Sequence, residues 1–322
     1  MTMKKLAAGI DIGGTNTAFG LVDREGRTVA TRAVSTTDYP VLDDYIDMLG
    51  ATVERLLAEA GADSELAGIG IGAPNANYYN GTIDNAANLP WRVVIPIVER
   101  IKARFTGIPV VVTNDANAAA IGEMVYGGAR GMRDFILVTL GTGVGSGFVA
   151  GGHLIYGHDS FAGELGHTIV IPGGRDCGCG RRGCLETYAS ATGIRRTVHE
   201  LTGSEIMPSV LRSVPFSELT AKVISEAAAQ GDPLALAAFE KTGEMLGIAL
   251  ANAVAITSPE AIFLFGGLAH AGDLLFEPTR RHMEENMLYN YKGKVQLLPS
   301  GIDEGNAAIL GASALVWDSI NG

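Results

Sequence analysis

Short apolar runs alternate with glycine-rich polar turns at the start of the chain. Residues 6–34 predict three strands, LAAGIDI, AFGLVD and RTVATRAV, because each run is rich in apolar or β-branched residues and is bounded by the turns GGTNT and REG. Apolar residues then recur at helical spacing over 41–60, which predicts a helix. The remaining elements expected here are a strand AGIGIGAP, a polar loop over 75–90, a helix near 94–105, a strand IPVVVTND and a helix ANAAAIGEMVYG. Together they form one α/β unit.

The same scheme of strand, glycine turn and strand begins again near residue 134. In DFILVTLGTGVGSGFVAGGHLI the turn TLGTGVGSG stands where DIGGTNT stands in the first unit, so we interpret the chain as an internal duplication. A loop region over 152–186 precedes the other predicted elements, which are helices at 187–202, 216–229 and 233–257, a last strand AIFLFGGL and a helix at 305–320. Strands that alternate with helices in this way predict an α/β fold, here two α/β domains with a cleft between them.

Composition and charge narrow the classes of function. The chain has 322 residues, enough for about two domains, and 43 glycines are the one excess in an otherwise ordinary composition. A net charge of −11 without any Lys/Arg-rich run argues against binding to nucleic acid. No apolar run approaches the roughly 18 residues of a membrane span, and Asp11 interrupts the N-terminal apolar run too early for a signal peptide. We therefore expect a cytoplasmic protein in a reducing environment, where clustered thiols bind metals more often than they form disulfides.

Two glycine turns, DIGGT at 11–15 and LGTG at 140–143, occupy equivalent places in the two halves. Glycines expose backbone N–H groups that bind phosphate, and Thr15 or Thr142 adds a hydroxyl donor. The alternative is a tight turn that needs glycine for its backbone conformation alone. The sequence has no G-x-x-x-x-G-K-[ST] motif. Residues 68–73 match G-x-G-x-x-A in letters only, because the glycines lie within an apolar strand and no helix follows.

Seven motifs, taken together, resemble the ROK family (repressors, open reading frames, sugar kinases) of the actin-like sugar kinase superfamily. They are DIGGT at 11–15, NLPW at 88–91, NDANAAAIGE at 114–123, LGTGVGSG at 140–147, GELGH at 163–167, CGCGRRGCLE at 177–186 and FGGL at 265–268. The resemblance implies two ribonuclease-H-like domains that close over ATP and a sugar, the first at 1–120 and the second at 121–304. A helix at 305–322 would return to the first domain. Because DIGGT already begins at residue 11, we expect no helix-turn-helix module ahead of it.

The resemblance implies an ATP-dependent hexose kinase that phosphorylates the 6-hydroxyl of its sugar. Asp115 follows an apolar strand, opens a helix and matches the family's general base; its position alone also allows a helix N-cap. Asp11 would organise Mg²⁺ through water. The residues expected to meet the phosphates are Gly13, Gly14, Thr15, Gly141, Thr142 and Gly143. Gly266 and Gly267 match the family's turn on the adenosine side of the nucleotide, with an ordinary strand-end turn as the alternative.

Recognition of a hexose needs several donors and acceptors fixed around the ring hydroxyls. The residues that match the family's sugar contacts are Asn88, Asn114, Asp115, Glu164, His167 and Glu186. Glucose is the first expected substrate, while mannose, fructose, allose and an N-acetylhexosamine stay open. Asn75 stands where family members commonly have the final glycine of G-x-P-G, and the tyrosines of the following ANYYNGT loop bear on specificity.

All three cysteines of the chain, Cys177, Cys179 and Cys184, lie in CGCGRRGCLE. They supply three soft ligands, and structural zinc takes four ligands in a tetrahedron. The resemblance implies His167 as the fourth ligand, with His153 and His158 as alternatives by proximity. A redox pair is disfavoured because the spacing differs from C-x-x-C, and a disulfide is disfavoured in a reducing environment. The zinc would hold together two loops that each carry a sugar ligand.

Two rivals belong to other classes of protein. One is a sugar-sensing regulator that keeps the fold without its own DNA-binding module, and the other is a sugar-binding protein without turnover. A regulator that had lost catalysis would lack the catalytic Asp, which this sequence keeps at 115. The resemblance also implies a homodimer or a homotetramer.

Overall fold

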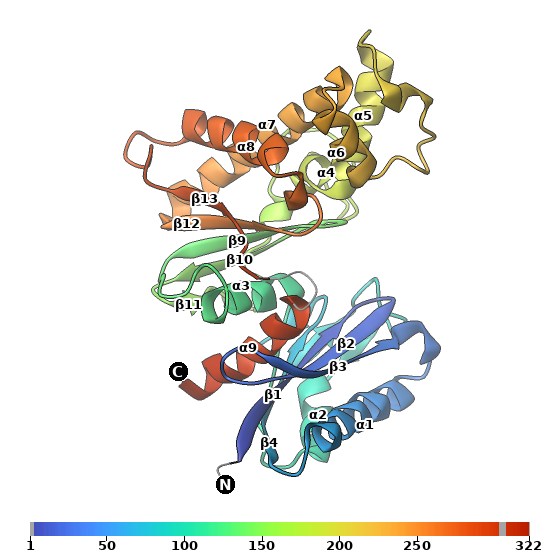
Figure 1. The fold of residues 1–322 in the computed structure, drawn as a ribbon, viewed down its shortest axis with the longest axis vertical. Helices are drawn as coiled ribbons and strands as arrows, with labels where there is room; N and C mark the ends of the chain where they lie inside the picture. The colour runs from blue at the N-terminus through green and yellow to red at the C-terminus, as the bar shows by residue number, and fades with distance from the viewer. Residues whose placement is uncertain (1–2, 303–306, 322) are drawn as a thin grey trace. The chain divides into compact units, whose positions relative to one another are not determined.

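The computed structural model describes residues 3–302 and 307–321, and Figure 1 shows its course. Contacts between Cα atoms divide the chain into two compact units. Unit 1 contains residues 1–132, 153–162 and 301–322, and unit 2 contains residues 133–152 and 163–300. Both units combine a β-sheet with helices, so the fold is α/β with two units. The domain bounds predicted at residues 120 and 304 stay predictions.

Unit 1 is built on a mixed sheet. Its strands are β1 (Lys4–Ile12), β2 (Asn16–Val22), β3 (Thr28–Ser35), β4 (Ser64–Gly72) and β8 (Val110–Thr113), in the spatial order β3-β2-β1-β4-β8. Strand β1 pairs antiparallel with β2 and parallel with β4, and β4 pairs parallel with β8. The carboxyl ends of three parallel strands therefore meet at one edge, where Asp11 lies opposite Gly72 and Gly72 lies opposite Thr113.

Helices cover both faces of this sheet. Successive residues of a strand point to opposite faces, and apolar residues of β1 are buried on each face. Leu6, Ala8, Ile10 and Ile12 of β1 share one apolar cluster with α1 (Leu42–Ala60) and α2 (Ile97–Arg104). Ala7 packs on the other face with Val316 of α9 (Ala307–Asn321). Figure 1 shows α9 (red) beside α3 (Asp115–Val125), and the two helices are in contact.

The glycines that spell G-x-G-x-x-A serve the packing of α9. A Cβ at Gly70 would run into the backbone carbonyl of Ala312, and a Cβ at Gly68 would meet the side chain of Val316. Glycine at these positions therefore lets the helix approach the sheet closely, and the structure gives these residues no place in a dinucleotide motif, since β4 leads into a loop.

Unit 2 repeats the topology of unit 1. The strands of its sheet are β9 (Phe135–Leu140), β10 (Val144–Ala150), β12 (Ala261–Phe265) and β13 (Gln296–Pro299), in the spatial order β10-β9-β12-β13, while the residues of the short β11 (His153–Leu154) are counted with unit 1. Strand β9 pairs antiparallel with β10 and parallel with β12, just as β1 pairs with β2 and β4. The matching order of these four strands supports the duplication inferred from the sequence.

Five helices pack together in unit 2. They are α4 (Glu186–Ala189), α5 (Ala191–Ser204), α6 (Ala221–Ala229), α7 (Pro233–Thr257) and α8 (Asp273–Asn286). Their buried residues share one cluster with Ile136, Val138 and Leu140, which alternate along β9 and so mark a single face of the sheet. Helices α7 and α8 lie side by side on this face (Figure 1).

Most predicted elements are confirmed, but the loop over 75–90 is more ordered than its polarity suggests. It contributes β5 (Ala76–Asn77) and β6 (Thr82–Asp84), which form a small sheet with β7 (Val94–Ile95). Helix α2 therefore begins at Ile97, directly after its N-cap Pro96, and not near 94. The helix predicted at 187–202 is two helices, because the side chain of Ser190 caps α5 by accepting a hydrogen bond from the N–H of Gly193.

Two elements near the C-terminal end are not indicated by the sequence pattern. Helix α8 is rich in charged residues and holds Pro278 in its interior, so its apolar spacing is weak. Strand β13 has four residues, and it shows that AIFLFGGL is not the last strand. Of the helix predicted at 305–320, residues from 307 form α9, and 305–306 lie outside the described residues. No helix in the described part of the chain has both the length and the apolar character needed to cross a membrane.

Candidate functional site

The first glycine turn, at 13–15, joins β1 to β2 in unit 1. The N–H of Gly13 donates to the carbonyl of Asn16 at 3.0 Å, and the Thr36 hydroxyl donates to the carbonyl of Gly13 at 2.8 Å. A second bond joins the Thr36 N–H to the carbonyl of Thr15 at 2.8 Å. The turn is therefore fixed from outside by one buried threonine. Sequence reasoning missed Thr36, which lies in the polar run TTDYP without any motif around it.

The predicted sugar contact Asn88 lies beside this turn. A Cβ at Gly14 would collide with the backbone carbonyl of Asn88, so glycine is needed for the close approach of the two segments. The side chain of Asn88 is exposed. The structure thus brings the NLPW segment and the DIGGT turn together, as two parts of one surface of unit 1.

Asp11 and Asp115 are grouped at the carboxyl edge of the unit 1 sheet. Asp11 is near the end of β1, Asp115 follows β8 and begins α3, and Gly72 lies between them, close to Asp11 Oδ1 and the Cα of Asp115. Burial, with a smaller contribution from the charge of Asp115, raises the pKa of Asp11 to about 6. Two carboxylates at one strand edge offer the oxygen ligands that Mg²⁺ prefers.

Asn114 and Asp115 have different roles at the start of α3, where Asn114 caps the helix and Asp115 presents an exposed carboxylate. The Asn114 side chain accepts a hydrogen bond from the N–H of Asn117 at 2.7 Å and is the N-cap of the helix. The alternative in which Asp115 is the cap is therefore wrong. The Asp115 carboxylate is exposed, and its Oδ1 accepts a hydrogen bond from the N–H of Ala116 at 2.8 Å.

The second glycine turn, at 141–143, joins β9 to β10 in unit 2. The Gly141 carbonyl accepts a hydrogen bond from the N–H of Ala191 at 2.9 Å, and the Thr142 carbonyl accepts one from the Thr192 hydroxyl at 3.1 Å. The first residues of α5 therefore lie against this turn. Ala191 and Thr192 donate hydrogen bonds to the carbonyls of this turn, just as Thr36 donates to carbonyls of the first turn.

Glu186 connects the second turn to the cysteine loop. Its Oε2 accepts a hydrogen bond from the N–H of Val144 at 3.0 Å, and its Oε1 lies 3.9 Å from the Sγ of Cys177. A Cβ at Gly143 would strike the Glu186 carboxylate. This explains the glycine at 143 by the close approach of a side chain. Val144 is a further contact that sequence reasoning missed, because it acts through its backbone.

Gly266 and Gly267 end β12, as expected. Gly266 has a φ of +100°, and a Cβ there would press on the backbone of Leu140, so the position requires glycine for two reasons. The N–H of Leu268 donates to the carbonyl of Leu140 at 3.1 Å and ties the turn to the end of β9. A Cβ at Gly267 would face open space, which leaves its backbone free for a ligand to approach.

The three cysteines and His167 form one cluster in unit 2. Their ligand atoms all lie within 4.8 Å of one another. The Sγ atoms of Cys179 and Cys184 are 3.7 Å apart, too far for a disulfide, and all three thiols are free. The Cys177 Sγ lies 3.7 Å from His167 Nδ1. Within the described residues this cluster includes neither of the alternatives His153 and His158.

The geometry of the cluster fits a tetrahedral metal. Zinc–sulfur bonds of about 2.3 Å place tetrahedral ligands roughly 3.8 Å apart, close to the two separations of 3.7 Å. Burial raises the pKa values of Cys177 and Cys184, so a bound cation is what would ionise them. The donor set, one imidazole and three thiols in one loop region, therefore fits structural zinc.

Glu164 and His167 belong to one short segment around η2 (Leu165–His167). The N–H of His167 donates to the carbonyl of Glu164 at 3.0 Å, and Arg181 Nη2 donates to the carbonyl of His167 at 2.7 Å. The segment with Glu164 is thus fixed to the cysteine loop. Unit 2 carries Glu164, His167 and Glu186, of which His167 belongs to the cluster and Glu186 contacts Cys177, while unit 1 carries Asn88, Asn114 and Asp115.

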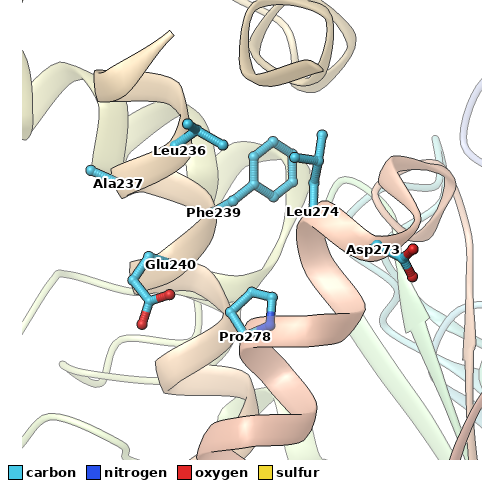
Figure 2. Close-up of a pocket in the computed structure, with 7 residues that line it drawn as sticks. All are labelled: Leu236, Ala237, Phe239, Glu240, Asp273, Leu274 and Pro278. Carbon is cyan, nitrogen blue, oxygen red and sulfur yellow. The ribbon is translucent and has the colours of Figure 1, made fainter. Parts of the chain in front are cut away.

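A pocket of about 420 Å³ between α7 and α8 is unrelated to these groups. Figure 2 shows the ring of Phe239 between the side chains of Leu236 and Leu274, while the carboxylates of Glu240 and Asp273 point away from them. The lining includes no sequence-predicted site residue. Small-molecule sites place several polar groups around the ligand. The residues that line this pocket are mostly apolar.

The chain matches the model of the ROK family over residues 7–319. It is 38% identical over 282 residues to the glucokinase of Streptomyces coelicolor, and the match covers 86% of each chain. A crystal structure of a ROK family glucokinase from Streptomyces griseus, in complex with glucose and AMPPNP, is 34% identical, with a TM-score of 0.78 and coverage of 97% of this chain and 99% of that one. The xylose repressor of Bacillus subtilis is 29% identical over 317 residues, which cover 97% of this chain and 77% of the repressor. The match extends over nearly the whole length and both units, and the chain belongs to the ROK family.

Proposed function

We propose that this protein transfers the γ-phosphoryl group of ATP to the 6-hydroxyl of a hexose, with glucose as the first substrate to test. The chain is an ATP-dependent sugar kinase, which is the activity of the glucokinases that it resembles over most of its length. The observation that carries the finer proposal is the pair of carboxylates, Asp11 and Asp115, beside the glycine turn at 13–15. Such a pair supplies both a cation partner and a proton acceptor.

Asp115 is the proposed general base. The oxygen of the sugar hydroxyl attacks the γ-phosphorus, the new O–P bond forms as the bond to the β-phosphate oxygen breaks, and ADP leaves. The proton of the hydroxyl passes to the Asp115 carboxylate. Its exposed position at the start of α3 leaves it accessible to a substrate, and Asn114 relieves it of the capping role.

The two glycine turns are the proposed phosphate-binding elements. Backbone N–H groups of 13–15 and 141–143, with the hydroxyls of Thr15 and Thr142, would hold phosphate oxygens. Bound Mg²⁺ would neutralise the charge of the β- and γ-phosphates, and Asp11 is the residue that would hold it through water. A carboxyl with a pKa of about 6 is mostly ionised at neutral pH, so Asp11 is charged where a cation needs it.

The sugar is the proposed ligand of the polar side chains around Asn88 and Asn114 in unit 1 and around Glu164, His167 and Glu186 in unit 2. Glu186 is oriented by the N–H of Val144 and by its place beside Cys177. The zinc ligands would be His167, Cys177, Cys179 and Cys184. Because four protein ligands close the coordination shell, zinc would supply structure and no chemistry.

The proposal is tested by incubating the purified protein with ATP, Mg²⁺ and a panel of glucose, mannose, fructose, allose and N-acetylhexosamines. Release of ADP identifies the substrate, and ³¹P NMR of the product identifies the phosphorylated hydroxyl. We expect the highest kcat/KM with glucose and a 6-phosphate as product. A different phosphorylated hydroxyl would contradict the proposed site of transfer. Sugar binding by calorimetry without any ADP release would instead favour a binding protein or regulator.

A further inference from the structure

Arg175 uses its whole hydrogen-bonding capacity inside unit 2. A guanidinium group has five N–H donors, and five acceptors lie within reach of that of Arg175. They are the Glu200 Oε1 at 2.8 Å and Oε2 at 2.6 Å, the Thr187 carbonyl at 2.6 Å, the Gly193 carbonyl at 3.2 Å and the Thr197 hydroxyl at 2.9 Å. The guanidinium carbon also lies 4.4 Å from the centre of the Tyr188 ring. Only 8% of the Arg175 side chain is exposed, against 56% of that of Glu200, so its bonds to Thr187, Gly193 and Thr197 form the more buried part of the network.

The backbone of Arg175 joins the same network to the cysteine loop. Its N–H donates to the Tyr188 hydroxyl at 3.0 Å, and its carbonyl accepts a hydrogen bond from the N–H of Gly183 at 2.8 Å. Gly183 directly precedes Cys184, and Arg175 is two residues before Cys177. One residue therefore links the segment before the cysteines, the segment between them, and α4.

Helix α4 needs this external support. It has only four residues, too few to be stable through its own hydrogen bonds. In a continuous helix the Thr187 carbonyl would accept from the N–H of Ala191, but that N–H donates to Gly141. Arg175 Nη1 supplies the missing donor to Thr187. Thr187 is the neighbour of Glu186, so the position of Glu186 depends on how this turn is held.

We infer that Arg175 is a positioning residue, which acts through α4 to hold the Glu186 carboxylate in place for the sugar. The inference rests on the proposed function, since it assigns Glu186 to the substrate. Lysine cannot replace the arginine, because a single ammonium group cannot supply five donors in a planar fork. The role of Arg175 is separate from that of the zinc ligands, because its side chain bonds to α4 and α5 and to none of the cysteines.

The test compares Arg175→Lys and Arg175→Ala with the control Arg281→Lys. Arg281 also bonds to both oxygens of one carboxylate, that of Glu240, but its side chain is half exposed, and it is not one of the proposed site residues. We expect Arg175→Lys to raise the KM for the sugar about 10-fold to 100-fold, as misplacement of a contact by about 1 Å does. The KM for ATP and the zinc content should stay within twofold of the wild type. Guanidinium chloride at low millimolar concentration should partly restore the sugar KM of Arg175→Ala.

Each other outcome overturns the inference. Equal losses for sugar and ATP, lost zinc, or a Lys variant that does not fold would show that Arg175 supports the fold in general. A Lys variant as active as Arg281→Lys would show that the network is dispensable. If the wild type phosphorylated no hexose, the proposed function would fail by itself. Calorimetry would then test the inference independently, because Arg175→Lys should still weaken binding of the sugar, and unchanged binding would overturn it.

Discussion

The Glu186 carboxylate accepts a hydrogen bond from the N–H of Val144, with 3.0 Å between Oε2 and nitrogen. Gly143 makes room for it, and its φ is not in the left-handed region, so only a steric effect is expected from a side chain there. Gly143→Ala should therefore displace the carboxylate and lower kcat/KM for the sugar by roughly 10-fold to 100-fold. Steady-state kinetics with varied sugar measures this effect.

A double-mutant cycle isolates the contact between Gly143 and Glu186. In a Glu186→Ala background the clash has no partner, so the added methyl of Gly143→Ala should cost much less stability than it does in the wild type. Gly203→Ala is the control, since a Cβ there meets nothing within 4 Å. Equal destabilisation by Gly143→Ala in both backgrounds would show that the turn itself rejects the methyl group.

Asp115→Asn should abolish most of the turnover. Without a carboxylate the proton of the attacking hydroxyl has no acceptor, and the loss of general base catalysis costs about 10²-fold to 10⁴-fold in kcat. The dissociation constant of the sugar, measured by calorimetry, should change by less than about tenfold, because an amide oxygen still accepts a hydrogen bond. The exposed Asp63→Asn serves as the matched control. A kcat within a few-fold of the wild type would remove Asp115 from the role of base.

Asp11→Asn should stabilise the protein above pH 6 while impairing catalysis. The folded state raises the pKa of Asp11 from 3.8 to about 6, so the folded protein binds the proton more tightly than the unfolded chain does. The resulting stability is present below about pH 4 and is lost as the pH rises through about 6. A shift of about 2 units corresponds to about 3 kcal/mol, which is the upper limit of the gain for Asn at pH 8.

Urea unfolding in Mg²⁺-free buffer between pH 5 and pH 8 checks this prediction. The difference in unfolding free energy between Asp11→Asn and the wild type should grow with pH over this range. Added Mg²⁺ should reduce the difference at pH 8, if the ionised carboxylate is a cation partner. If the difference in unfolding free energy did not depend on pH, ionisation of the buried Asp11 carboxyl would not destabilise the folded protein.

The sequence predicts the fold well where periodicity is strong, and it fails where tertiary contacts decide. The first hairpin and the helix at 42–60 follow from apolar spacing. Helix α8 does not, because Pro278 and its charges hide the pattern, and the break at Ser190 depends on one side-chain cap. Nor can a local pattern show that the N–H of Ala191, at the start of α5, donates to the distant carbonyl of Gly141.

The sequence predicted the motifs of the candidate site but not the hydrogen bonds that hold these motifs in place. Both glycine turns and the cysteine cluster are visible in the letters, since they need particular residue types at fixed spacing. Their supports are not visible. Thr36 reaches back over 23 residues to Gly13, and Arg175 bonds to carbonyls that carry no sequence signal. Backbone acceptors can be supplied by any residue, so a sequence does not reveal which of them a side chain will meet.

Zinc binding should depend on His167 and not on the other histidines near it in sequence. We expect about one zinc per chain in the wild type, and a more than 100-fold lower affinity in His167→Ala, a loss at least as large as that caused by altering an outer-shell partner. His153→Ala and His158→Ala should keep the wild-type metal content, because neither belongs to the cluster. Elemental analysis gives the content, and competition with a chromophoric chelator gives the affinity.

His167→Ala should also lower the melting temperature and raise the sugar KM, since the loops with Glu164 and Glu186 lose a common anchor. Full zinc retention by His167→Ala, or equal losses in all three variants, would contradict the assignment of this histidine as the fourth ligand.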